Sequence, residues 1–206
     1  MKKINLFVTL MAILFASEVI AHGAPRHKMI ATIMIDAPAD KVWAVINNYG
    51  DMSWHPDIDS SQSDKGNEVG SVRTLTFKNG GTIVDDLDKY KAGKMSYKYK
   101  LVSISSVGTV HHGEEDLDIP FLPISISGSM GILSVKDKGG KALVKWQAGY
   151  YRSDERNDPP EELGEDVAKA GIRDFLSKGL MGLAQTFDAN VSVTDVGIVL
   201  DKVTLN

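Results

Sequence analysis

The spacing of hydrophobic positions changes twice along the chain, and each change predicts a different type of element. Met29 to Ile35 reads MIATIMI, a short apolar run rich in β-branched residues, which predicts a strand. Asp36 and Pro38 then precede a helix predicted over 39–49, because aspartate caps free amides and proline suits a first turn. The apolar face of this helix is made by Val42, Trp43, Val45 and Ile46.

From residue 58 onward the period changes to two, as in strands with one wet face. Asn79-Gly80-Gly81 separates two alternating arms and predicts a hairpin, because its glycines tolerate positive φ. The strands expected in this part of the chain cover 69–78, 82–90, 95–105, 124–135 and 142–151. The segment 107–123 between them has no clear period and is expected to be irregular.

A long helix is predicted over 161–189, after the break at Asn157-Asp158-Pro159-Pro160. Gly171, Gly179 and Gly182 weaken this helix and permit close approach, either of the sheet or of a bound molecule. The tail 190–206 alternates weakly and is either an extra strand or mobile. The helix carries an apolar stripe at spacings of three and four, formed by Ala168, Ile172, Phe175, Leu176, Leu180, Leu183 and Phe187.

This order of elements predicts an α+β, helix-grip fold, in which a curved antiparallel sheet of about seven strands wraps around the long C-terminal helix. We expect one domain over 29–189 and a C-terminal extension over 190–206. A curved sheet closed by one helix commonly leaves an apolar cavity of ligand size. The expected lining, for which plain core packing is the alternative, is Trp54, Arg73, Leu75, Phe77, Tyr97, Tyr99, Trp146, Tyr150, Ile172, Phe175 and Leu176.

The first residues have the pattern of a secretory signal peptide over 1–21. Lys2 and Lys3 precede an apolar run of roughly 13 residues, too short for a bilayer span of about 20. Small residues at the end of the run suit cleavage after Ala21. We therefore expect a periplasmic protein whose mature chain starts with a mobile leader over 22–28.

Composition excludes several classes of function. The chain of 206 residues has no cysteine, so disulfides, thiolate metal sites and a cysteine nucleophile are excluded. A formal charge of −4 provides no basic excess for nucleic acid. Motifs for a hydrolase elbow, a phosphate loop and a dinucleotide site are absent from the sequence, so no cofactor is expected. His111-His112 with the nearby acidic residues could hold a metal, but a solvated loop or a partner surface is the expected reading.

An enzyme would need an acid and a base within the cavity. Arg73 is the most suggestive candidate, because an inward arginine must meet either a bound anion or a carboxylate such as Glu68 or Asp85. His55 stands between Trp54 and Pro56 and is expected to order a turn rather than act as a base. No catalytic residue is assigned from the sequence. The candidates considered are His55, Glu68, Arg73, Asp85, Tyr97 and Tyr99.

Several segments resemble a known family. The opening IDAPADKVWAVINNYGDMSWHPDI over 35–58 resembles the START/Bet v 1-like superfamily, which includes polyketide cyclase/dehydrase and lipid-transport proteins. The combination of SWHP, GNEVGSVRTLTFKNGG, LDKYKAGKMSYKYKL, YYR and NDPPEELGEDVAKA is more specific, and it resembles the MxaD-type periplasmic proteins of methanol-oxidising bacteria. The resemblance covers 1–189.

The resemblance implies an accessory role in methanol oxidation. Proteins of this type are linked to the quinoprotein methanol dehydrogenase and to its cytochrome c, so these two are the expected partners. The leading hypothesis is therefore a non-catalytic accessory protein that assists dehydrogenase assembly or its encounter with the cytochrome. A carrier of a small hydrophobic ligand and a cyclase-like enzyme remain the alternatives.

Overall fold

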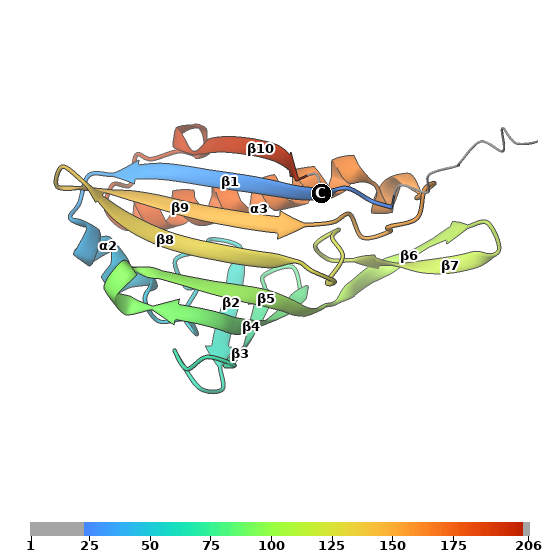
Figure 1. Ribbon diagram of the computed structural model, residues 1–206, viewed down its shortest axis with the longest axis horizontal. Coiled ribbons are helices and arrows are strands. Elements are labelled where there is room, and N and C mark those ends of the chain that lie inside the picture. The colour runs from blue at the N-terminus through green and yellow to red at the C-terminus, as the bar shows by residue number, and fades with distance from the viewer. Residues whose placement is uncertain (1–22, 204–206) are drawn as a thin grey trace, which may run out of the picture.

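A computed structural model describes residues 23–203, in which strands wrap around one long helix (Figure 1). Within these residues, eight strands form one antiparallel sheet in the order β10-β1-β9-β8-β5-β4-β3-β2, and β6 and β7 form a separate hairpin. The strands are β1 (Arg26–Ile35), β2 (Ile58–Ser63), β3 (Val72–Phe77), β4 (Thr82–Lys91), β5 (Ser96–Ile104), β6 (Ser106–His112), β7 (Glu115–Pro120), β8 (Met130–Lys138), β9 (Lys141–Tyr150) and β10 (Gly197–Val203). The helices are α2 (Ala39–Ile46) and α3 (Glu165–Gln185), and the 3-10 turns are η1 (Ala92–Lys94), η2 (Glu161–Leu163) and η3 (Val193–Asp195).

The predicted α+β architecture, a curved antiparallel sheet around a long C-terminal helix, is confirmed. The main sheet has eight strands among the described residues instead of about seven, because part of the predicted extension joins it as β10. No helix in the described part of the chain has the length and apolarity that crossing a membrane requires. The predicted signal peptide, 1–21, lies outside the described residues.

The N-terminal boundary of the domain was predicted incorrectly, whereas at the C-terminal end one of two open alternatives is confirmed. β1 begins at Arg26, so residues 26–28 belong to the sheet and not to a mobile leader. His27 is buried opposite Tyr150 of β9, which explains why a polar start still forms a strand. At the other end, the sequence left a strand and a mobile tail open for 190–206. Gly197 to Val203 form β10, which pairs antiparallel with β1 over seven residues.

The segment 107–123, expected to be irregular, instead contains the β6–β7 hairpin, which projects from the body of the protein (Figure 1). Its strands pair with each other and carry mostly exposed side chains, so burial imposed no alternating pattern that the sequence could reveal. The following strand begins later than predicted, at Met130, because 121–129 forms a loop over the core.

Helix α3 is shorter than the predicted 161–189, since η2 and Gly164 precede it and it ends at Gln185. A methyl group on any of its three predicted glycines would meet the chain's own atoms, and on Gly171 it would lie 2.9 Å from Pro123 Cδ. A methyl group on Gly179 would lie 2.5 Å from the Trp146 ring, and one on Gly182 would overlap the Trp54 carbonyl oxygen. Close packing of the helix therefore accounts for all three glycines.

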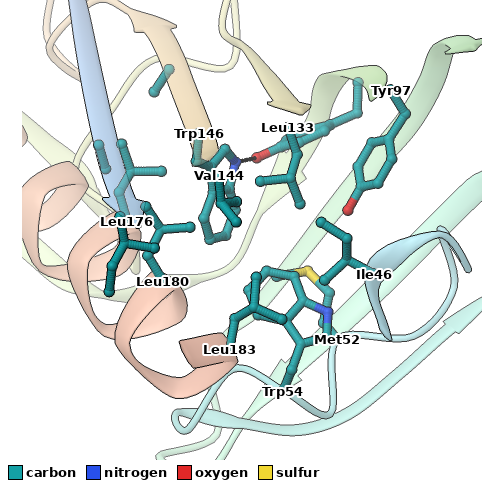
Figure 2. Close-up of a cluster of buried hydrophobic side chains, with 14 of the residues drawn as sticks. Ile46, Met52, Trp54, Tyr97, Leu133, Val144, Trp146, Leu176, Leu180 and Leu183 are labelled. Atoms are coloured by element: carbon teal, nitrogen blue, oxygen red, sulfur yellow. Dashed lines mark hydrogen bonds between the residues drawn. The ribbon is translucent and has the colours of Figure 1, made fainter. Parts of the chain in front are cut away.

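The core lies between α3 and the inner face of the sheet, and Figure 2 shows Trp146 of β9 facing Leu176 and Leu180 of the helix. The predicted inward faces of the strands are confirmed by burial. Arg73, Leu75 and Phe77 of β3 are all at most 6% exposed. On β9, Val144, Trp146, Ala148 and Tyr150 are likewise buried.

Candidate functional site

The eleven residues predicted to line a cavity all lie between the inner face of the sheet and α3. Ten of them are buried, and Phe175 is half-buried. The structure divides them into two groups. Leu75, Tyr99, Tyr150, Ile172, Phe175 and Leu176 line one enclosed space, which we call the inner cavity. The other five, which do not line it, are Trp54, Arg73, Phe77, Tyr97 and Trp146.

The inner cavity encloses about 30 Å³, room for one or two water molecules and not for a ligand. The loop 121–129 closes it, because Leu122 and Ile124 point into the space that the sequence left open. Met130 and Asp85 also line the cavity. The expectation of a ligand-sized cavity is therefore wrong for this conformation. The apolar run Phe121-Leu122-Pro123-Ile124 was the sequence signal that could have indicated that this loop fills the cavity.

Arg73 is fully buried beside Asp85 of the neighbouring strand. Of the two alternatives, a bound anion or a carboxylate of the protein, its partner is therefore the carboxylate. Its Nε and Nη2 donate to the two oxygens of Asp85 at 3.0 and 2.7 Å. Its Nη1 donates to the Tyr49 carbonyl at 2.9 Å, and the Tyr49 hydroxyl donates to Asp85. Glu68, the other candidate, is exposed. We call Arg73, Asp85, Tyr49, Tyr97 and Tyr99 the arginine cluster.

Aromatic rings enclose the guanidinium of Arg73. Its carbon lies 4.3 Å from the centre of the Tyr49 ring and 5.1 Å from that of Tyr99, within cation–π range. The Tyr99 hydroxyl accepts a bond from Trp146 Nε1 at 2.9 Å. The cluster thus joins β3, β4 and β5, and the bond to Trp146 connects it to β9.

Burial governs the acid–base properties of the cluster. Burial is the largest single influence and lowers the pKa of Arg73, but Asp85, Tyr97 and Tyr49 together outweigh it and the pKa rises. Burial raises the pKa of Tyr97 to about 12, and burial also raises the pKa of Tyr49 and Tyr99. The tyrosines therefore remain protonated near neutral pH, and Arg73 remains charged.

His55 packs against α3, its ring stacked on Phe175 with centroids 4.7 Å apart. Its Nδ1 accepts from the Asp57 amide at 3.2 Å, which leaves Nε2 to donate to the Phe175 carbonyl at 3.0 Å. Burial lowers its pKa, so the ring is neutral at pH 7. Both nitrogens are bound to backbone groups, and the residue orders the turn that precedes β2.

An open groove of about 350 Å³ lies where the β3–β4 turn, the loop 121–123 and α3 meet. Within the predicted set, Phe77 and Phe175 reach it. The groove was not predicted from the sequence, because four segments far apart in the chain build it. The lining residues are Asp57, Phe77, Lys78, Asn79, Phe121, Leu122, Pro123, Gly171, Asp174, Phe175 and Lys178.

The floor of the groove is aromatic and its rim is charged. The Phe77 ring centre lies 4.6 Å from that of Phe121 and 6.0 Å from that of Phe175. On the rim, Lys178 Nζ lies 2.8 Å from Asp174 and 3.2 Å from Asp57, and the bond to Asp174 contributes most to raising its pKa. Lys78 has no ion-pair partner in the described part of the chain.

The groove lies directly over the inner cavity. Phe175 and Leu122 line both spaces, so their side chains form part of the wall between them. Phe175 is half-buried, unlike the fully enclosed residues of the arginine cluster.

The two histidines once considered for a metal lie on the β6–β7 hairpin. His111 Nδ1 contacts Asp116 at 2.9 Å, whereas Glu115 accepts a bond from Arg156 at 3.0 Å. Within residues 23–203, no group of three His, Asp or Glu side chains is placed to hold a metal ion.

Comparison with known proteins gives a family and a fold. A family model described as polyketide cyclase / dehydrase and lipid transport matches residues 26–188. The comparison with curated proteins finds no match. Similar solved structures include the protein XoxI from Bacillus cereus, with 21% identity, a TM-score of 0.59, and coverage of 78% of this chain and 94% of that one.

Two further structures extend the likeness. A protein of Nitrosospira multiformis is 22% identical with a TM-score of 0.58, covering 79% of this chain and 97% of that one. The major latex-like protein 151 of Panax ginseng is 17% identical with a TM-score of 0.54, covering 79% and 98%. At such identities the likeness shows the fold alone.

Proposed function

Because the chain belongs to the polyketide cyclase/dehydrase and lipid transport family, we propose that it is a non-catalytic binding protein for a small molecule with an apolar body. One observation carries this proposal: an open groove with an aromatic floor lies over the inner cavity, and Phe175 and Leu122 border both. The groove volume of about 350 Å³ falls within the usual range of ligand pockets.

The groove offers two kinds of contact to one ligand. Phe77, Phe121 and Phe175 supply an apolar surface for rings or an alkyl chain. Lys78 and Asn79 at the rim supply donors for a polar head group. An amphipathic molecule therefore fits better than a fully apolar one, which would leave these rim groups unused.

The state of the polar core residues supports binding rather than catalysis. A catalytic acid or base must exchange protons with a substrate near neutral pH. The Arg73–Asp85 pair is bound to its own neighbours, and both ring nitrogens of His55 are bound to backbone atoms. If the protein is instead a cyclase-like enzyme, Arg73→Ala or Tyr97→Phe should abolish turnover in a folded domain.

The binding proposal is tested by filling the groove from its rim. Asn79→Trp places a large ring in the groove without altering the core, and Asn190→Trp is the matched exposed control outside it. Titration with dodecanoate and with anilinonaphthalene sulfonate should give affinity at least about tenfold weaker for the first variant and unchanged for the second. Equal affinities in both variants would overturn the groove as the site.

A second candidate function is the accessory role in methanol oxidation. The SWHP segment and the KNGG turn, which carry much of the MxaD-type resemblance, meet beside the groove. The Lys78 amide donates to the Asp57 carbonyl at 3.0 Å, and Gly81 packs directly against the Phe121 ring. Trp54 and His55 of the SWHP segment are buried, whereas Lys78, Asn79 and Gly80 of the turn are exposed, so the turn is the part of this resemblance that a partner can reach.

In this role the protein acts in the periplasm after cleavage behind Ala21, and its partners are methanol dehydrogenase and cytochrome c. A deletion strain should show lower methanol-dependent reduction of cytochrome c, while the purified protein turns over no substrate. Restoration by a plasmid copy is the control. Normal electron transfer in the deletion strain would exclude this role, and N-terminal sequencing of the mature protein tests the cleavage site.

A further inference from the structure

Charge is separated along the long axis of the molecule, although the formal net charge is only −4. Residues 89–100 contain five lysines and no acidic residue, and residues 136–145 contain four lysines and one aspartate. At the opposite end, 106–120 contain four acidic residues without lysine or arginine, and 154–166 contain seven acidic residues and one arginine. Figure 1 shows the β4–β5 and β8–β9 turns at one end and the β6–β7 hairpin at the other.

The basic end is built on the outer face of the sheet. Strand pairing sets Lys89 directly opposite Lys98, and Lys91 opposite Ser96, on the face turned away from α3. Ser96 in turn pairs with Ser134, and Ser134 with Lys145, so this row crosses four strands. At about 4.8 Å per strand, the row spans roughly 14 Å. We call Lys89, Lys91, Lys98, Lys136 and Lys145 the lysine surface.

Most of this positive charge is not neutralised by the residues that the structure describes. Lys98 is paired with Asp88 at 2.8 Å. Lys89, Lys91, Lys136 and Lys145 have no ion-pair partner among residues 23–203. Like charges directly opposite each other, as at Lys89 and Lys98, destabilise a strand pair. A hollow of about 240 Å³ lies between Lys89, Lys91 and Lys98, with Ile132 at its floor.

We propose that the lysine surface docks an acidic face of a protein partner. Its width exceeds that of a single small anion, and its charge is complementary to a carboxylate-rich protein surface. An anionic membrane fits less well, because none of the exposed large hydrophobic side chains in the described part of the chain lies in 89–98 or 130–145. An acidic partner attracts the lysine surface and repels the acidic end of the molecule. This difference orients the protein as it approaches the partner.

This inference rests on the accessory role, whose two partners provide the probes. The mature protein is titrated against purified methanol dehydrogenase and, separately, purified cytochrome c, at about 50 and about 200 mM salt. One of them should bind, more weakly at the higher salt. Lys89→Glu with Lys145→Glu should weaken binding at least about tenfold. Lys65→Glu with Arg173→Glu, an equal charge change elsewhere on the surface, should change it less than about twofold.

Other outcomes overturn the inference. Equal losses in both double variants would show an effect of net charge alone. Binding of neither protein, or binding to vesicles of phosphatidylglycerol and phosphatidylcholine in about a 1:3 ratio instead, would also exclude a protein docking surface. Failure of the accessory role is distinguishable, because it removes the deletion phenotype itself. A deletion strain fully restored by the Lys89/Lys145 variant would refute the lysine surface and leave that role intact.

Discussion

The arginine cluster and the groove both combine aromatic rings with charged side chains, but the cluster encloses its charges and the groove leaves them at the surface. Arg73 and Asp85 are each 1% exposed and satisfy each other's hydrogen bonds. Lys178 and Asp57 at the groove are paired but about two-fifths exposed. Charged and aromatic side chains therefore stabilise the fold in the arginine cluster, whereas in the groove they remain accessible to a ligand.

Removing one partner of the enclosed pair should have the largest effect. Asp85→Ala leaves the Arg73 guanidinium buried without its carboxylate, and we expect a loss of about 3–5 kcal/mol in the free energy of unfolding. Urea denaturation followed by tryptophan fluorescence measures it. A loss no greater than that of an exposed pair would contradict the description of the cluster as a structural centre.

A smaller loss is expected from crowding the cluster. A methyl group on Gly131 of β8 would overlap the Tyr99 ring, so Gly131→Ala should cost roughly 1–3 kcal/mol. Gly108→Ala in β6 is the matched control, since a methyl group there meets no atom within 4 Å. Denaturant midpoints of the two variants give the comparison, and equal midpoints would show that Tyr99 moves aside freely.

Alkaline pH should weaken the cluster gradually. Burial raises the pKa of Tyr97 to about 12, above its ordinary value near 10. Above pH 10 the unfolded chain releases this proton while the folded chain retains it, so stability falls between pH 10 and 12. The slope from one such tyrosine reaches about 1.4 kcal/mol per pH unit. Tyr97→Phe should reduce the slope in denaturation measured from pH 9 to 11, and an unchanged slope would exclude Tyr97 as a source.

The smallest effect is expected at the groove. Lys178→Met removes ion pairs to Asp57 and Asp174 that remain solvated, so stability should change by less than about 1 kcal/mol. The same denaturation experiment measures it beside Asp85→Ala. If the two variants lost equal stability, the distinction between an enclosed and an accessible set of charges would fail.

The burial of residues could be predicted where it follows from a local sequence pattern. The positions of residues that depend on contacts between distant segments could not be predicted. Alternation alone placed Arg73, Leu75 and Phe77 on the inner face of β3, and helical spacing placed Leu176 and Leu180 on the inner side of α3. Such periodicity reflects burial of one face, which every short stretch of sequence records. The fold class followed from the order of these elements.

The size of the inner cavity could not be read in this way. It depends on Leu122 and Ile124, which enter from a loop without any period. The groove combines residues near positions 57, 78, 121 and 175, whose proximity is fixed only when the sheet has closed on α3. The β6–β7 hairpin has mostly exposed side chains, so its sequence carries little of the signal that burial imposes.

The placement of β1 has a consequence for the way the chain must assemble. Its two neighbours in the sheet, β9 and β10, come from the last third of the sequence, so β1 cannot pair in the sheet until residues 141–150 are available. Contacts of such long sequence separation slow folding. The domain should therefore fold slowly for its size, with β1 unpaired until its neighbours β9 and β10 are available.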